Sequence, residues 1–170
     1  MLRQHAARGE VRHAYLFCGP PGLGRRTLAL RLAQALNCTK PIAAGIPCGH
    51  CRDCKQIEAM QHPDMNVIQA LDGDGLPKEG GTLKVDQVRE VQHSLSLKPY
   101  QAKYRVALFL RFQEANDNAA NALLKTLEEA PAHAILLLTA DNPEQLLPTI
   151  VSRCEILRLR ALPLKVIEAD

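Results

Sequence analysis

The feature that most constrains this chain is a glycine-rich loop between a short apolar segment and a helical pattern. Residues 14–18 (AYLFC) are apolar, and residues 19–24 (GPPGLG) follow at once. Glycine adopts backbone conformations that other residues avoid, so these segments predict a buried strand that enters a tight turn. Leucine and alanine then recur at helical spacing through residues 25–37. The sequence therefore predicts a strand, a loop and a helix in direct succession.

The alternation of strand and helix continues along the chain. Apolar runs predict four more strands and helical spacing predicts two more helices and a helical turn: strands at 65–70, 105–110, 134–139 and 154–159, helices at 85–96 and 117–129, and the turn at 143–147. The strands are apolar throughout, which is typical of a parallel sheet covered by helices on both faces. We therefore predict a three-layer α/β domain over residues 1–162, with a surface loop at 71–82 and a linker beginning at residue 163.

Composition places the chain among globular proteins. Of its 170 residues, 46% are hydrophobic and 23% are charged, which excludes intrinsic disorder. The formal net charge of +3 is too small to argue for nucleic-acid binding by itself. No apolar run approaches the ~20 residues of a membrane span, and residues 1–17 contain no apolar signal-peptide core. We expect a cytoplasmic protein with no membrane partner.

The glycine loop has the frame of a phosphate-binding loop. Such a loop reads G-x-x-x-x-G-K-[ST], and its backbone N–H groups surround a phosphate at a helix N-terminus. Gly19, Gly22 and Gly24 supply this frame between the predicted strand and helix. The position and context therefore favour a nucleotide-binding type of domain, although a plain glycine-rich turn remains an alternative.

Two substitutions damage this motif. Arg25 stands at the position of the lysine that neutralises the phosphates, and Arg26 stands at the hydroxyl that binds Mg²⁺. A planar guanidinium is larger than an ammonium group, and a cation at position 26 cannot bind a divalent metal. Thr27 supplies a hydroxyl one residue late, rotated by roughly 100° around the helix. ATP and Mg²⁺ are therefore doubtful ligands of this loop.

The acidic residues of an ATPase are also missing. Hydrolysis requires an aspartate that holds Mg²⁺ and a nearby group that orients water, both at the end of a strand. The predicted strand at 105–110 ends in Leu110 and Arg111, and Glu114 comes a few residues too late. We expect a loop that is kept as structure and does not hydrolyse ATP, with an unusual but working ATP site as the alternative.

Four of the six cysteines are clustered. Cys38, Cys48, Cys51 and Cys54 fall within seventeen residues, in the predicted insertion at 38–63. Two successive C-x₂-C steps and one earlier cysteine match the four thiolates of a tetrahedral Zn²⁺ site. A site with four protein ligands is closed, so we predict a structural zinc and leave His50 exposed. An iron–sulfur cluster, free thiols and disulfides remain alternatives.

Several segments together resemble the bacterial DNA polymerase III clamp-loader family. They are HAYLFCGPPGLGRRT, the cysteine insertion, LKVDQVREV, NALLKTLEEAP and TIVSRC. The chain is similar to the first domain, of the AAA+ class of P-loop NTPases, in gamma/tau and delta-prime subunits. Motor subunits of this family keep the lysine, the hydroxyl and the acidic pair. The departures at Arg25, Arg26, Leu110 and Arg111 resemble delta prime, the stator that does not hydrolyse ATP.

The resemblance also implies partners and a role for one arginine. It implies assembly with gamma/tau and delta subunits, which load the sliding clamp onto primed DNA. In Ser152-Arg153-Cys154 it implies that Arg153 is an arginine finger for a neighbouring subunit's ATP site, with Cys154 in a packing role. Residues 139–142 fall where the family keeps a polar sensor of phosphate, and a purely structural role is the alternative for them. An ATP-hydrolysing gamma/tau-type motor and a free-standing zinc module that binds nucleic acid are the competing hypotheses.

Overall fold

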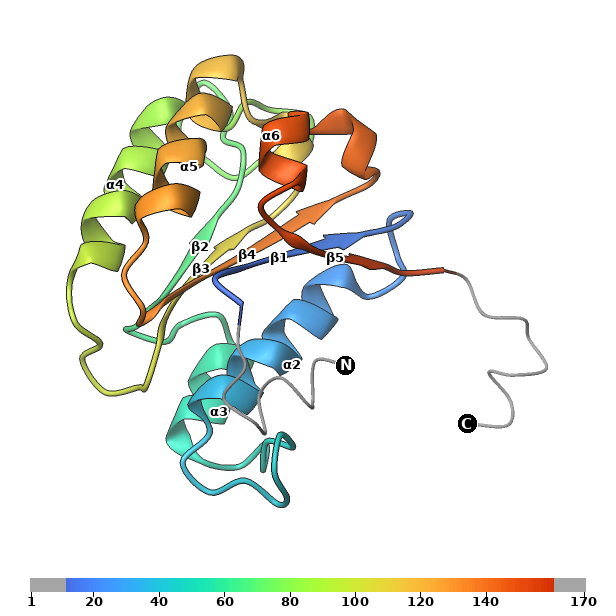
Figure 1. Ribbon diagram of the computed structural model, residues 1–170. Helices are drawn as coiled ribbons and strands as arrows, with labels where there is room; N and C mark the ends of the chain where they lie inside the picture. Colours follow the sequence, from blue (N-terminus) through green and yellow to red (C-terminus); the bar gives the residue numbers. More distant parts are fainter. Residues whose placement is uncertain (1–11, 161–170) are drawn as a thin grey trace.

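A five-stranded parallel sheet forms the centre of the domain (Figure 1). The computed structural model describes residues 12–160. The strand order is β2-β3-β4-β1-β5. The strands are β1 (Ala14–Cys18), β2 (Met65–Ile68), β3 (Arg105–Phe109), β4 (Ala134–Ala140) and β5 (Glu155–Arg158). This confirms the predicted sheet, and because all strands are parallel, their carboxyl ends meet at one edge.

Helices cover both faces of the sheet. Figure 1 shows α4, α5 and α6 on one face and α2 and α3 on the other. The helices are α2 (Arg25–Asn37), α3 (Arg52–Glu58), α4 (Val85–Ser96), α5 (Asp117–Glu129) and α6 (Pro148–Val151), with 3₁₀ turns η1 (Phe112–Glu114) and η2 (Pro143–Gln145). The predicted α/β class with three layers is therefore confirmed.

Strand β1 shows how one sequence fills two hydrophobic cores. Successive side chains of a strand point to opposite faces. Leu16 and Cys18 lie in the core under α4 and α5, whereas Tyr15 and Phe17 lie in the core under α2. Helices cover both cores, so the side chains on both faces of β1 are buried. This explains why the strand is apolar at every position.

The ends of the elements follow local chemistry. Asn116 caps α5, since its side chain accepts a hydrogen bond from Ala119 N at 2.9 Å. The structure adds the short helix α6, with Pro148 in its first turn, which is too short to produce a helical periodicity. Strand β2 ends two residues earlier than predicted. The predicted linker at 163–170 lies outside the described residues.

The loop at 71–82 is exposed over most of its length, as predicted. Isolated bridges join Leu71 to Pro77 and to Thr82. Within residues 12–160, no helix is long and apolar enough to cross a membrane.

Candidate functional site

The phosphate-type loop lies between the end of β1 and the start of α2. Gly19 N donates to Ala140 O at 3.3 Å and to Asp141 O at 3.1 Å, so the loop begins against the end of β4. Gly19 has φ +154°, and a Cβ there would lie 2.8 Å from Leu159 O. Glycine is therefore required at this position both by backbone conformation and by the neighbouring strand.

The rest of the loop keeps the geometry of its glycines. Gly22 has φ +90° and Gly24 has φ +83°, both in the region that favours glycine. Gly24 precedes α2, which has no side-chain cap and no acidic residue in its first turn. Arg26 and Thr27 are exposed in that turn. The structure thus places the predicted loop residues together at one helix N-terminus.

Arg25 is held by a carboxylate from the neighbouring strand. Arg25 Nη1 lies 2.6 Å from Asp141 Oδ1, and the two side chains are 10% and 26% exposed. Asp141 directly follows β4, within the segment that matches a phosphate sensor. The cation at the lysine position therefore has a protein partner, a contact that the sequence did not predict.

The end of β3 carries a second arginine in place of acidic residues. Leu110 is buried, and Arg111 adopts a left-handed conformation with φ +55°. Arg111 N donates to Thr139 Oγ1 at 2.8 Å, and Arg111 Nε lies 2.6 Å from Glu114 Oε1. The hydrogen bond that Arg111 donates to Glu114 raises the pKa of Arg111. Glu114 is thus engaged with Arg111 and with Gly80 N.

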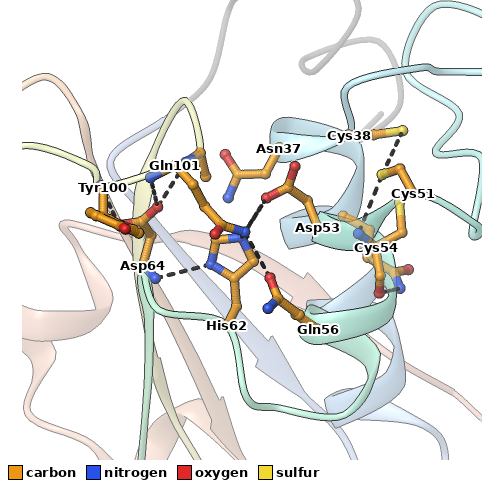
Figure 2. Close-up of polar contacts among 12 residues, drawn as sticks. Asn37, Cys38, Cys51, Asp53, Cys54, Gln56, His62, Asp64, Tyr100 and Gln101 are labelled. Carbon is orange, nitrogen blue, oxygen red and sulfur yellow. Dashed lines mark hydrogen bonds and ion pairs between the residues drawn. The ribbon is translucent and has the colours of Figure 1, made fainter.

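The four predicted cysteines meet at one point. Their sulfur atoms all lie within 4.8 Å of one another. Cys51 Sγ is 3.9 Å from Cys38 Sγ, and Cys54 lies on α3 with its side chain buried (Figure 2). Ligands 2.3 Å from a tetrahedral Zn²⁺ are separated by about 3.8 Å. The cysteines could therefore hold a metal ion, and the donor set suits a tetrahedral thiophilic one.

Backbone N–H groups surround these sulfur atoms. Cys48 Sγ accepts from His50 N at 3.3 Å and from Cys51 N at 3.2 Å, and Cys38 Sγ accepts from Cys48 N at 3.3 Å. The first two bonds lower the pKa of Cys48. Burial opposes ionisation of Cys51, but N–H donors from Thr39 and Cys54 lower its pKa to about 6. These donors stabilise thiolates, which are the form that binds metal.

The other predicted features of the cluster also find their place. Cys51 is the N-cap of α3, and its sulfur accepts from Cys54 N. The two cysteines therefore share one helical turn. Burial raises the pKa of Cys38 and of Cys54. None of the six cysteines forms a disulfide within residues 12–160, which argues against the disulfide alternative.

A buried polar network, which the sequence did not predict, connects α3 to the sheet (Figure 2). His62 Nε2 lies 2.6 Å from Asp53 Oδ1 on α3, and His62 Nδ1 accepts from Asp64 N at 2.9 Å. Gln101 Nε2 donates to Asp53 Oδ1 at 2.9 Å and to Gln56 Oε1 at 2.7 Å. His62 therefore carries its proton on Nε2 and joins α3 to the start of β2.

Asp64 fixes the loop before β3. Its carboxylate accepts hydrogen bonds from the backbone N–H groups of Tyr100, Gln101 and Ala102. Burial alone would raise the pKa of Asp64, but these three donors outweigh burial and lower it. The signal for this network in the sequence is the segment His62-Pro63-Asp64, in which a histidine and an aspartate flank a proline at the end of the insertion.

The His62→Ala substitution tests this network. It would leave Asp64 N without its side-chain partner and Asp53 with Gln101 alone, so we expect a loss of about 2–4 kcal/mol in the free energy of unfolding. Chemical denaturation measures this loss. His50→Ala is the matched control, because His50 is exposed and its loss should cost less than about 0.5 kcal/mol. Equal stability of both variants would contradict the role of His62.

Arg153 lies far from the phosphate-type loop of its own chain. It comes just before β5, whereas the loop follows the carboxyl end of β1, and the register pairs Tyr15 with Glu155. A strand of this length separates the two by roughly 15 Å. Arg153 Nη2 lies 2.8 Å from Glu128 Oε1, and Arg153 Nη1 donates to Thr149 O at 2.9 Å. Its side chain is 39% exposed.

The two remaining cysteines, Cys18 and Cys154, pack in the core, a role that the resemblance implied for Cys154. Cys18 is buried in β1, and Cys154 packs against the same core. Burial raises the pKa of Cys18 to about 11 and that of Cys154 to about 12. Neither thiol is activated for chemistry.

The fold and loop define an α/β domain of the P-loop NTPase type, in its AAA+ class. A likeness to solved structures supports this class. A gamma subunit-related protein of DNA polymerase III from Thermotoga maritima superposes with a TM-score of 0.71 at 21% identity, covering 98% of this chain and 48% of that one. The RuvB Holliday junction branch migration motor of the same organism gives 0.56 at 20% identity, covering 99% and 44%.

The chain belongs to the DNA polymerase III clamp-loader subunit family. The family model described as "DNA polymerase III, delta subunit" matches residues 1–163. The chain is 41% identical to DNA polymerase III subunit delta' of Pseudomonas aeruginosa over 152 residues, which cover 89% of this chain and 44% of that protein. It is 34% identical to subunit delta' of Bacillus subtilis (99% and 48%) and 36% identical to subunit tau of Escherichia coli (91% and 22%). The chain thus spans less than half the length of these curated relatives.

Proposed function

We propose that this chain is the first domain of a delta-prime-like stator subunit of the DNA polymerase III clamp loader. In this role it does not hydrolyse ATP itself. It assembles with gamma/tau and delta subunits in the cytoplasm and helps them load the sliding clamp onto primed DNA. The observation that carries this proposal is the state of the phosphate-type loop, where Arg25 is paired with Asp141 at 2.6 Å.

The chemistry of the loop supports a non-hydrolysing subunit. A working site needs a hydroxyl and a carboxylate for Mg²⁺ and a group that orients water. Arg26 and Arg111 stand at two of these positions, and Glu114 is engaged with Arg111 at 2.6 Å. Cations at metal-binding positions repel Mg²⁺. The loop therefore does not support phosphoryl transfer, although it keeps its shape.

The position of Arg153 supports a contribution to a neighbouring subunit. The guanidinium cannot reach its own loop across the length of β1 and β5. It is exposed and directed by Glu128 and by Thr149 O, so a neighbour that docks against this end of the strands can receive it. There it would stabilise the charge that develops on the γ-phosphate during hydrolysis.

The cysteine cluster supports a structural metal. Cys38, Cys48, Cys51 and Cys54 would hold Zn²⁺ with no open position, and the metal would fix α3 against α2. A closed site supplies folding energy rather than catalysis. We therefore assign the zinc module a role in shape, with no step in ATP chemistry.

A gamma/tau-type motor is the second candidate, favoured by the 36% identity to tau of Escherichia coli. The two candidates differ in the turnover of ATP by the purified full-length protein. We expect no measurable release of inorganic phosphate above a no-protein control with Mg²⁺ and ATP, because the metal-binding groups are absent. Release at a rate of about 1 s⁻¹ or more, in the ordinary range for enzymes, would establish the motor instead.

A further inference from the structure

Asp141 supplies the phosphate-type loop with a negative charge from the protein itself. Its carboxylate lies 2.6 Å from Arg25 Nη1, and the Arg25 side chain is only 10% exposed. Arg25 occupies the position whose cation neutralises phosphate in a working loop. We propose that Asp141 is the resident anion of this loop and fills it in place of a nucleotide phosphate. This inference rests on the proposed non-hydrolysing role and explains how the loop keeps its shape without a ligand.

The sheet places Asp141 at the loop. Strands β1 and β4 are neighbours, with Cys18 paired to Ala140. The residues that follow these two strands, Gly19 and Asp141, are therefore also neighbours. Gly19 N donates to Asp141 O at 3.1 Å. The backbone of Asp141 thus holds the start of the loop, while its side chain reaches Arg25 at the start of α2. One residue contacts both ends of the loop.

The local charges explain why an anion is needed here. The first turn of α2 has no acidic residue, and Gly24 provides no side-chain cap. Unpaired N–H groups and the helix dipole make this end positive, and Arg25 and Arg26 add two more charges. The pKa of Arg111 is raised mainly by its hydrogen bond to Glu114 and also by the charge of Asp141. Asp141 therefore faces cations from α2 and from the end of β3.

Neutralising Asp141 should turn the loop into an open anion site. Arg25 would remain mostly buried without its partner, and the N–H groups of α2 would stay in place. The ligand class is a phosphate group, whether free or part of a nucleotide. Because position 26 is arginine, binding should not depend on Mg²⁺. The defect at Arg26 would then affect metal binding, while Asp141 would keep phosphate away from Arg25.

Calorimetric titration of the full-length protein tests this assignment, with ATP and inorganic tripolyphosphate as probes, with and without Mg²⁺. We expect Asp141→Asn to bind both probes at least about tenfold more tightly than wild type, since it regains one charge-assisted contact to Arg25. Asp141→Glu keeps the charge and should bind like wild type. Adding Arg25→Ala to Asp141→Asn should remove the gain.

Equal binding by wild type and Asp141→Asn would overturn the proposal, as would a gain that persists without Arg25. Asp141→Thr is a second neutral variant. If neither neutral variant folds while Asp141→Glu does, excess inorganic phosphate should rescue folding, and failure of that rescue would also overturn it. The stator function is tested separately by ATP turnover of the wild-type protein, so binding by Asp141→Asn that equals wild type leaves that function standing.

Discussion

The Arg153→Ala substitution is expected to reduce ATP hydrolysis at the one neighbouring site of a reconstituted clamp loader that Arg153 would complete, by about 10³-fold or more. The expected loss is large because a guanidinium stabilises charge that forms only in the transition state. In this chain Arg153 is directed by Glu128 at 2.8 Å and by Thr149 O at 2.9 Å. Phosphate release by the assembled complex is the measurement, and size-exclusion chromatography checks that assembly is unchanged.

Arg31→Ala is the matched control for this experiment. Arg31 is also an exposed arginine with one glutamate partner, Glu58 at 2.6 Å, but it lies on α2 beside the cysteine cluster. Surface ion pairs of this kind contribute only about 0–1 kcal/mol, so turnover should stay near that of wild type. Arg153→Lys keeps the charge but lacks the planar fork, and it should recover little activity. Full turnover by assembled Arg153→Ala would refute the finger in trans.

Removal of zinc is expected to unfold the cysteine insertion while the sheet remains folded. Structural zinc contributes on the order of 10–16 kcal/mol in small zinc-finger peptides. Here α3 has only seven residues, too few for a stable helix alone, and Ile42 in the insertion is 73% exposed. Hydrogen exchange after chelation should therefore show loss of protection over residues 38–58 and retained protection in β1, β3 and β4.

Single substitutions make the same test specific to the cluster. Elemental analysis should find one zinc per wild-type chain, and Cys51→Ser should lose it, because a hydroxyl replaces a thiolate ligand. Cys154→Ser is the matched control, since Cys154 lies outside the cluster and packs against the core. A wild-type protein without zinc, or Cys51→Ser with one full equivalent, would contradict the assignment.

The sequence predicted the elements well because their signals are local. The apolar strands, the Asn116 cap and the two C-x₂-C steps each lie within a few residues. The Arg25–Asp141 pair joins residues 116 positions apart, so it depends on β1 and β4 being neighbours. The contact between His62 and Asp53 was not predicted for the same reason, since either residue alone is compatible with an exposed loop. Local patterns thus predicted the fold and the cysteine cluster, whereas the partners of buried charges required the three-dimensional arrangement.

The parallel sheet gives this domain a direction. It has the exposed Arg153 before the amino end of β5 and a phosphate-type loop at the carboxyl end of β1. If Arg153 acts in trans as proposed, neighbouring domains would join by unlike surfaces, head to tail. A domain with a working loop and a donor can extend such a series on both sides. A domain that donates Arg153 but fills its own loop with Asp141 can activate a neighbour on one side only. In an assembly built this way, it is the subunit that ends the row of active sites.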